Sequence, residues 1–193
     1  MCLTRVPGAR GSLQWVGLPQ PGMMITIRAY RDSDSASVGR LIARTYSVFN
    51  LGFAPPDQRA GLLGPFRFAE STEPAYRTAI AEAIGAPMVL VGEEAGAIVG
   101  VLRGGRLDRR GGTVLQSLFV AADHQRRGVG RRLVTRFEQV SLARGVAVVR
   151  VASTLYAVPF YQALAYQRST GVRTMRSFQG SGLAYQPMKK TLA

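Results

Sequence analysis

The centre of the sequence, residues 115–143, reads LQSLFVAADHQRRGVGRRLVTRFEQVSLA. Residues 114–120 are a short, mostly apolar stretch, which predicts a strand. A turn with Gly128 and Gly130 follows, and apolar residues at helical spacing then predict a helix through Val140. A glycine turn that opens a helix presents unpaired backbone N–H groups at the positive end of the helix dipole. The stretch therefore predicts a phosphate-binding turn, and the arginines on both sides of the glycines agree with it in charge.

Two common phosphate-binding motifs fit this turn poorly. A P-loop ends in Gly-Lys-Ser or Gly-Lys-Thr, but two arginines follow Gly130. A dinucleotide-binding fingerprint needs a third glycine where Leu133 stands, and an acidic residue about 20 residues further on. No acidic residue follows Glu138. The P-loop is therefore excluded, and the dinucleotide fingerprint is disfavoured.

The length and composition predict one domain with a real core. The chain has 193 residues, of which 47% are hydrophobic. Strand and helix patterns run from residue 24 to residue 190 without a linker, so we expect a single domain over residues 23–193. Residues 1–22 are rich in glycine and proline and show no apolar period. We expect them to form a flexible extension.

The net charge of +14 is the most unusual number in the composition. Basic proteins attract nucleic acids and other polyanions. The charge comes almost entirely from arginine, since the only lysines are Lys189 and Lys190. A solvated, arginine-rich surface is the simpler explanation, and a nucleic-acid partner stays open as the alternative.

Cysteine usage and hydropathy bear on the compartment. The only cysteine is Cys2, so no disulfide can form within the chain. No apolar run reaches about 18 residues, the length a membrane-spanning helix needs. The first residues carry Arg5 and Arg10 without the apolar stretch that a signal peptide requires. We therefore expect a cytoplasmic protein that does not contact a membrane.

The order of predicted elements indicates an α/β fold with a mixed sheet and helices on both faces. In chain order we expect a strand at 24–28, a helix at 34–49, one or two helices within 57–85, a hairpin at 88–102, the strand and helix of the central stretch, a strand at 146–151, a short helix at 157–164, and tail strands at 166–175 and 183–189. Within the hairpin, residues 93–96 are expected to form the turn.

Two segments resemble the motifs of one known family. Residues 125–130, Gln-Arg-Arg-Gly-Val-Gly, resemble the Q/R-x-x-G-x-G/A signature of the GNAT superfamily of N-acetyltransferases. Residues 157–166 resemble the family's A-x-x-F-Y-x-x-x-G-F/Y segment, with Ala165 in place of the glycine. The two segments lie in the family's order and at its separation. The resemblance implies a GNAT-like acyl-CoA N-acyltransferase fold.

The resemblance also implies acetyl-CoA as the donor, with no metal, and a small-molecule or peptide amine as the acceptor. In the family, the turn holds the pyrophosphate and a splayed strand pair binds the pantetheine arm. Here that pair would be 114–120 and 146–152. The residues so implied in binding acetyl-CoA are Leu118, Phe119, Val120, Gln125, Arg126, Arg127, Gly128, Val129, Gly130 and Arg131. Tail strands often form dimer contacts in this family, which leaves a homodimer open.

Tyr161 matches the family tyrosine that serves as general acid in some members. The alternative is a core aromatic, because apolar residues surround it in the sequence. Many members carry a glutamate on the central strand as general base, but that strand here offers only Gln116 and Ser117. We therefore expect the base to be ordered water, or Glu93 or Glu94 if the hairpin reaches the site.

His124 is the only histidine, and it stands beside the turn. A metal site needs several converging ligands, so we expect a surface-loop histidine. The absent glutamate and the high charge leave one rival from another class, a basic module with this fold that binds nucleic acid or a regulatory partner with weak or no catalysis.

Overall fold

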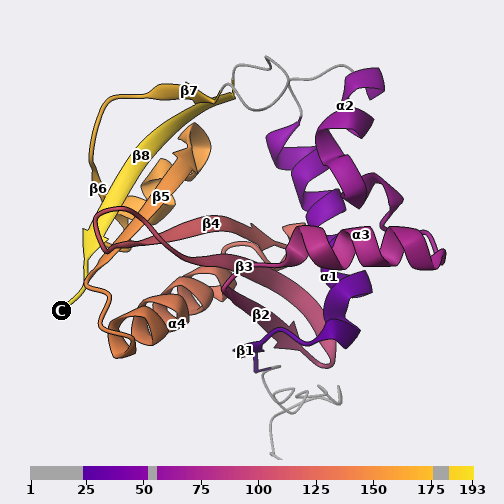
Figure 1. The fold of residues 1–193 in the computed structure, drawn as a ribbon, viewed down its shortest axis with the longest axis horizontal. Helices are drawn as coiled ribbons and strands as arrows, with labels where there is room; N and C mark the ends of the chain where they lie inside the picture. The colour runs from indigo at the N-terminus through magenta and orange to yellow at the C-terminus, as the bar shows by residue number, and fades with distance from the viewer. Residues whose placement is uncertain (1–23, 52–55, 176–182) are drawn as a thin grey trace, which may run out of the picture.

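The computed structural model describes residues 24–51, 56–175 and 183–193. The predicted extension, residues 1–22, lies outside the described residues. All described strands belong to one eight-stranded sheet in the order β1-β2-β3-β4-β5-β8-β6, and β7 also pairs with β8 (Figure 1). The strands are β1 (Thr26–Ala29), β2 (Met88–Glu94), β3 (Ala97–Leu107), β4 (Thr113–Val120), β5 (Val148–Thr154), β6 (Gln167–Arg168), β7 (Arg173–Met175) and β8 (Leu183–Thr191).

The helices cover the two faces of this sheet. They are α1 (Ser35–Thr45), α2 (Pro56–Leu63), α3 (Pro74–Ile84), α4 (Val129–Ala143) and α5 (Val158–Gln162), with single turns η1 (Asp32–Asp34), η2 (Tyr46–Asn50), η3 (Gly64–Phe68), η4 (Ala122–His124) and η5 (Leu155–Ala157). One buried cluster joins α4 and α5 to the sheet, and a second joins α1 and α3 to its other face. Among the described residues, none of these helices is long and apolar enough to span a membrane. The expected mixed sheet with helices on both faces is confirmed.

The helical stripes predicted from the sequence face the sheet. On α1, the buried side chains include Val38, Leu41 and Ile42. On α4, Leu133, Val134 and Phe137 are completely buried. Fully burying one such side chain stabilises the fold by about 1.5–3 kcal/mol. These stripes therefore fix how α4 lies across the sheet, and with it where the turn before α4 points.

The structure differs from the prediction most clearly at the hairpin turn and in the tail. The hairpin turn consists of Ala95 and Gly96 alone, with φ values of 49° and 81°. Positive φ at both central residues is the type I′ geometry, which matches the twist of the flanking strands. As a consequence Glu93 and Glu94 belong to strand β2 and not to the turn. The tail strand predicted at 166–175 is two short strands, and both pair with β8.

Candidate functional site

Strands β4 and β5 pair only at one end. Their parallel register covers three residue pairs, from Thr113 opposite Val149 to Leu115 opposite Val151. Beyond that point β5 stays paired with β8 as far as Thr154. The two strands therefore separate. From residue 116 to residue 120, the edge of β4 that faces β5 has no paired strand, while the other edge stays paired with β3. The predicted binding residues Leu118, Phe119 and Val120 lie on this stretch.

A bulge in β4 sets which side chains face which layer. On β3, Arg103 lies opposite Ser117 and Gly104 lies opposite Leu115, which leaves Gln116 without a partner. An extra residue of this kind bends a strand and changes which face its side chains occupy. Leu115 and Leu118, three residues apart, consequently both pack against the cluster under α4. Phe119 packs against the cluster under α1.

The turn before α4 has an open, left-handed backbone. Gly128 is the N-cap of α4, with φ 85° and ψ −1°. A Cβ atom at Gly128 would meet no heavy atom within 4 Å. The N–H of Arg132 donates to the Gly128 carbonyl at 3.0 Å and so begins the helical ladder. The N–H groups of the preceding helical residues are left free by the geometry of any helix start, and they point outward from the turn.

Gly130, the second glycine of the turn, is required by close packing and not by its backbone conformation. A Cβ atom at Gly130 would lie 3.2 Å from the Phe160 ring on α5. The same added atom would lie 3.6 Å from Leu118 on β4. The first turn of α4 therefore approaches α5 and β4 closely, and a small residue is needed there. Val129, between the two glycines, is buried and anchors the turn to the core.

The arginines of the turn divide into two kinds. Arg126, Arg131 and Arg132 are exposed, and within the described part of the chain none of them forms an ion pair. Arg127 differs, because its Nη2 donates a hydrogen bond to Glu94 Oε1 at 2.9 Å. Arg126 also has an unusual backbone, with φ 64°. Three cations are thus available beside the free N–H groups, and the fourth is engaged.

Glu94 and His124 lie together beneath the turn. The Glu94 side chain is only 1% exposed, and its Oε2 lies 2.8 Å from His124 Nε2. His124 Nδ1 lies 2.7 Å from Asp123 Oδ1, and the histidine side chain is 16% exposed. This hydrogen bond with His124 is the main cause that lowers the pKa of the Asp123 carboxyl. The expectation of a surface-loop histidine is therefore wrong: the type I′ turn places Glu94 where it holds the ring.

Glu93 is also engaged, on the other side of β2. Arg28 Nε donates to Glu93 Oε2 at 2.8 Å. The same guanidinium donates to both carboxylate oxygens of Asp34, at 2.7 and 2.9 Å. The hydrogen bond from Arg28 holds the pKa of the Asp34 carboxyl below its usual value. Neither Glu93 nor Glu94 is therefore a free carboxylate that could take a proton from an acceptor.

Tyr161 lies in the core between aromatic neighbours. It is 5% exposed. Its ring meets Phe160 and Tyr166 edge-on, with centroids 5.0 and 5.4 Å apart. Burial is the main cause that raises the pKa of the Tyr161 phenol, and Tyr156 adds to the effect. The phenol therefore stays protonated throughout the physiological range, which is the form that a general acid needs.

A second tyrosine, which the sequence reasoning missed, lies beside β4. Tyr46 opens the π-helical turn η2 and meets the Phe119 ring edge-on, with centroids 5.8 Å apart. Burial, with a contribution from Tyr156, raises the pKa of Tyr46 to about 12. Phe119 lies on the free edge of β4, so this contact places the Tyr46 ring beside the predicted binding stretch. π-Helical turns are frequent at functional sites, but the sequence pattern gives no signal for one here.

Ser117 presents a polar atom on β4. Its Oγ is buried and makes no hydrogen bond with any described residue. It lies two residues before Phe119 in the strand, and therefore on the same face of β4. Gln116, the other candidate for the position of the missing glutamate, lies in the bulge and is exposed.

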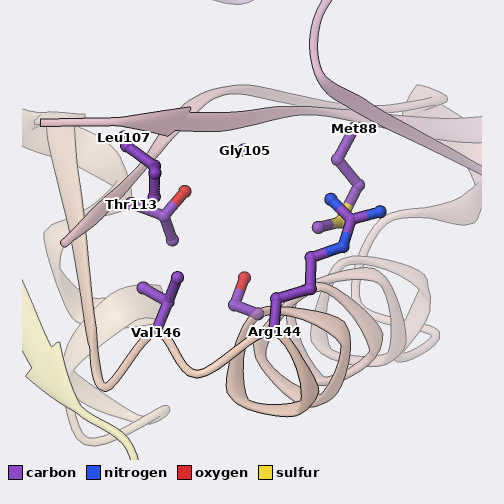
Figure 2. Close-up of a pocket in the computed structure, with 7 residues that line it drawn as sticks. Met88, Gly105, Leu107, Thr113, Arg144 and Val146 are labelled. Carbon is purple, nitrogen blue, oxygen red and sulfur yellow. The ribbon is translucent and has the colours of Figure 1, made fainter. Parts of the chain in front are cut away.

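A cavity of about 160 Å³ lies elsewhere, at the opposite end of α4 (Figure 2). Its lining residues are Met88, Gly105, Leu107, Thr113, Ser141, Arg144 and Val146. The hydroxyls in this lining are already engaged, since Ser141 donates to the Phe137 carbonyl at 2.8 Å and Thr113 donates to the Arg106 carbonyl at 3.4 Å. The cavity is therefore separate from the turn and offers no free hydroxyl to a ligand.

Solved structures share this architecture. A GCN5-related N-acetyltransferase from Rhodopseudomonas palustris superposes with a TM-score of 0.66 at 22% identity, covering 87% of this chain and 96% of that chain. A putative acetyltransferase from Salmonella typhimurium, solved with its cofactor acetyl-CoA, gives 0.60 at 20% identity, covering 88% and 95%. The PaiA N-acetyltransferase from Thermoplasma acidophilum, in complex with coenzyme A, gives 0.62 at 12% identity, covering 88% and 99%. At these identities the likeness shows the fold.

The sequence itself places the chain in a family. No curated protein matches it at the sequence level. Residues 64–192 match the family model described as the acetyltransferase (GNAT) domain, which spans α3, the central turn and the strands up to β8. The described structure and the motifs at the turn agree with that match. The chain therefore belongs to the GNAT acetyltransferase family.

Proposed function

We propose that the protein transfers the acetyl group of acetyl-CoA to a primary amine by direct attack. One observation carries the proposal: the open glycine turn at the start of α4 lies at the end of the unpaired edge of β4. The turn provides a site for a diphosphate, and the edge provides backbone groups for an extended amide-containing arm. Coenzyme A consists of these parts in this order. Structural neighbours solved with acetyl-CoA or coenzyme A support the choice of donor.

The residues of the turn fit the diphosphate. The free N–H groups at the start of α4 and the positive end of the helix dipole attract anions. The open space beside Gly128 leaves room for phosphate oxygens. Exposed Arg126 and Arg131 supply counter-charge, while Gln125 and the backbone of Phe119 and Val120 would contact the remainder of the donor.

Tyr161 supplies the proton that the leaving thiolate needs. The neutral amine attacks the thioester carbonyl carbon with its lone pair, and the carbon–sulfur bond breaks with both electrons on sulfur. Tyr161 donates its phenolic proton to that sulfur. The proton lost by the amine nitrogen returns to Tyr161 through water, so the enzyme ends unchanged. A backbone N–H on the free edge of β4 would polarise the thioester carbonyl, where negative charge develops.

Ser117 is our candidate for holding the water that takes the amine's proton. Leaving a buried hydroxyl unpaired costs about 1–3 kcal/mol, so a water bonded to Ser117 Oγ would stabilise the site. The carboxylates that could have replaced it are engaged with Arg28 and Arg127. A base this weak favours an acceptor that arrives as an uncharged amine.

A direct assay tests the function. Release of free thiol from acetyl-CoA is measured with a panel of small amines, peptide N-termini and lysine peptides, each against a reaction without amine. Turnover above hydrolysis with any amine supports the proposal. Failure of calorimetry to detect coenzyme A binding would refute it. Ser117→Ala should lower turnover about tenfold or more and leave coenzyme A affinity unchanged.

A basic binding module is the second candidate, and one surface favours it. Arg131, Arg132 and Arg136 line a shallow groove between α4 and Ile27 on β1. Such a row of cations suits a polyanion. DNA binding that weakens steeply as salt rises, together with no acetyl transfer, would favour this candidate.

A further inference from the structure

The carboxylate of Glu94 is one of the most buried charged groups in the described part of the chain, and it lies under the turn. Its side chain is 1% exposed. One oxygen accepts from Arg127 at 2.9 Å, and the other lies 2.8 Å from His124 Nε2. Both partners belong to the segment that leads into Gly128, yet Glu94 precedes them by about 30 residues. The end of β2 is therefore tied to the turn by two contacts on one carboxylate.

The turn needs this support because its backbone is strained. Arg126 has φ 64° and Gly128 has φ 85°. The left-handed conformation costs about 1–2 kcal/mol for a residue other than glycine, so the strain lies at Arg126. Such conformations persist where surrounding contacts hold them. Arg127 stands between these two residues, and it is the residue that Glu94 holds. Releasing Arg127 would free the segment to relax, and the N–H groups would lose their common direction.

The negative charge of Glu94 is a second reason why Arg127 matters for donor binding. A buried carboxylate beneath a diphosphate site repels the ligand unless a cation cancels it. The Arg127 guanidinium contacts Glu94 through Nη2 and offsets its negative charge, while Arg126 and Arg131 form no ion pair with the described residues and remain for the phosphates. Arg127 would therefore affect donor binding through Glu94 and not by touching phosphate.

We propose that Glu94 is a positioning residue for donor binding, which holds Arg127 and His124 so that the backbone of the turn faces the diphosphate. The inference rests on the proposed use of coenzyme A. It assigns Glu94 and Arg127 one shared role. The charge of the buried carboxylate adds a second expectation: removing Arg127 alone leaves that charge uncompensated, so it is worse for binding than neutralising both partners together.

Calorimetry with coenzyme A on the full chain tests this. Glu94→Ala is expected to raise the dissociation constant about 10- to 100-fold. Arg127→Met is expected to weaken binding to a similar degree, and adding Glu94→Gln to Arg127→Met is expected to recover part of the affinity. Glu93→Ala is the matched control, because it removes the neighbouring carboxylate of the same strand and leaves the turn untouched. Its affinity should stay within about twofold of the wild type.

Further measurements separate positioning from general stability. Affinity for pantetheine, which lacks the diphosphate, should be unchanged in Glu94→Ala, and kcat at saturating acetyl-CoA should also be retained. If coenzyme A and pantetheine weaken together in Glu94→Ala, or if Glu94→Ala binds coenzyme A as tightly as Glu93→Ala does, the inference is overturned. If Glu94→Ala does not fold, the same comparison of coenzyme A with pantetheine on Arg127→Met still decides. Wild-type protein that binds no coenzyme A would refute the proposed function itself, and the inference would fall with it.

Discussion

Two glycines at opposite ends of α4 allow a matched test of the diphosphate site. Gly128 precedes the helix with φ 85°, and Gly145 follows it with φ 77°. A Cβ atom at either position would meet nothing within 4 Å. A glutamate introduced at either position should therefore carry the same backbone strain, about 1–2 kcal/mol, and the same added charge. Only Gly128→Glu places that charge at the predicted phosphate site.

The expected effect on binding is large. A carboxylate about 5 Å from a phosphate charge, at an effective dielectric constant of about 20, is repelled by about 3 kcal/mol. That energy corresponds to more than about a hundredfold loss of affinity. Loss of folded protein cannot explain weaker binding by Gly128→Glu. An acidic side chain at the start of a helix is stabilised by about 0.3–1 kcal/mol, and one at its end is destabilised. The Gly145→Glu control should therefore be the less stable of the two proteins.

Calorimetric titration with coenzyme A and thermal unfolding of both variants check this. Gly145→Glu should bind like the wild type, and Gly128→Glu should show no measurable binding. Gly128→Ala, which carries the strain without the charge, should bind within a few-fold of the wild type. Equal affinity of Gly128→Glu and Gly145→Glu would show that the diphosphate does not lie at this turn.

Three further variants probe single residues. Tyr161→Phe should lower turnover about 10²- to 10⁴-fold while the coenzyme A dissociation constant stays within about twofold, and equal turnover at every pH would remove Tyr161 from the mechanism. Arg126→Gly should relieve the left-handed strain and raise unfolding stability by up to about 1 kcal/mol, yet weaken coenzyme A binding; loss of stability in urea would contradict this. Asp34→Asn should cost about 1–3 kcal/mol at neutral pH. Because Arg28 lowers the pKa of Asp34 in the folded state, the wild type should lose this advantage as pH falls below about 4, and urea titrations should then converge for the two proteins.

Local features of the site were predictable because they depend on neighbouring residues. The strand, the glycine turn and the helix of the central stretch follow from apolar periodicity and from the conformational freedom of glycine. The structure has these elements as β4, the turn at Gly128 and α4. Ala165, which replaces the family's glycine, even adopts the left-handed backbone, with φ 65°. The roles assigned to the turn residues and to Tyr161 stay predictions that the experiments above test.

Contacts between distant segments were not predictable from periodicity. The prediction of the hairpin turn at 93–96 was two residues too long, and this error hid that Glu94 points at the turn from strand β2. The aromatic contact between Tyr46 and Phe119 depends on how α1 crosses the sheet. Burial of the whole apolar stripe of α1 sets that crossing. His124 was expected at the surface because its partner Glu94 lies 30 residues away in the sequence, where no local pattern indicates the contact.

The sequence by itself determined the family, the glycine turn and the arginine charge around it, because each depends on residue types at short and fixed spacing. Only the tertiary structure decided which of those arginines are available to a ligand. Arg126 and Arg127 are neighbours of the same type in the sequence and both are exposed, yet only Arg127 forms an ion pair with a buried carboxylate of the described residues. Packing of the β2–β3 hairpin against the turn creates that difference, and packing is a property of the whole sheet.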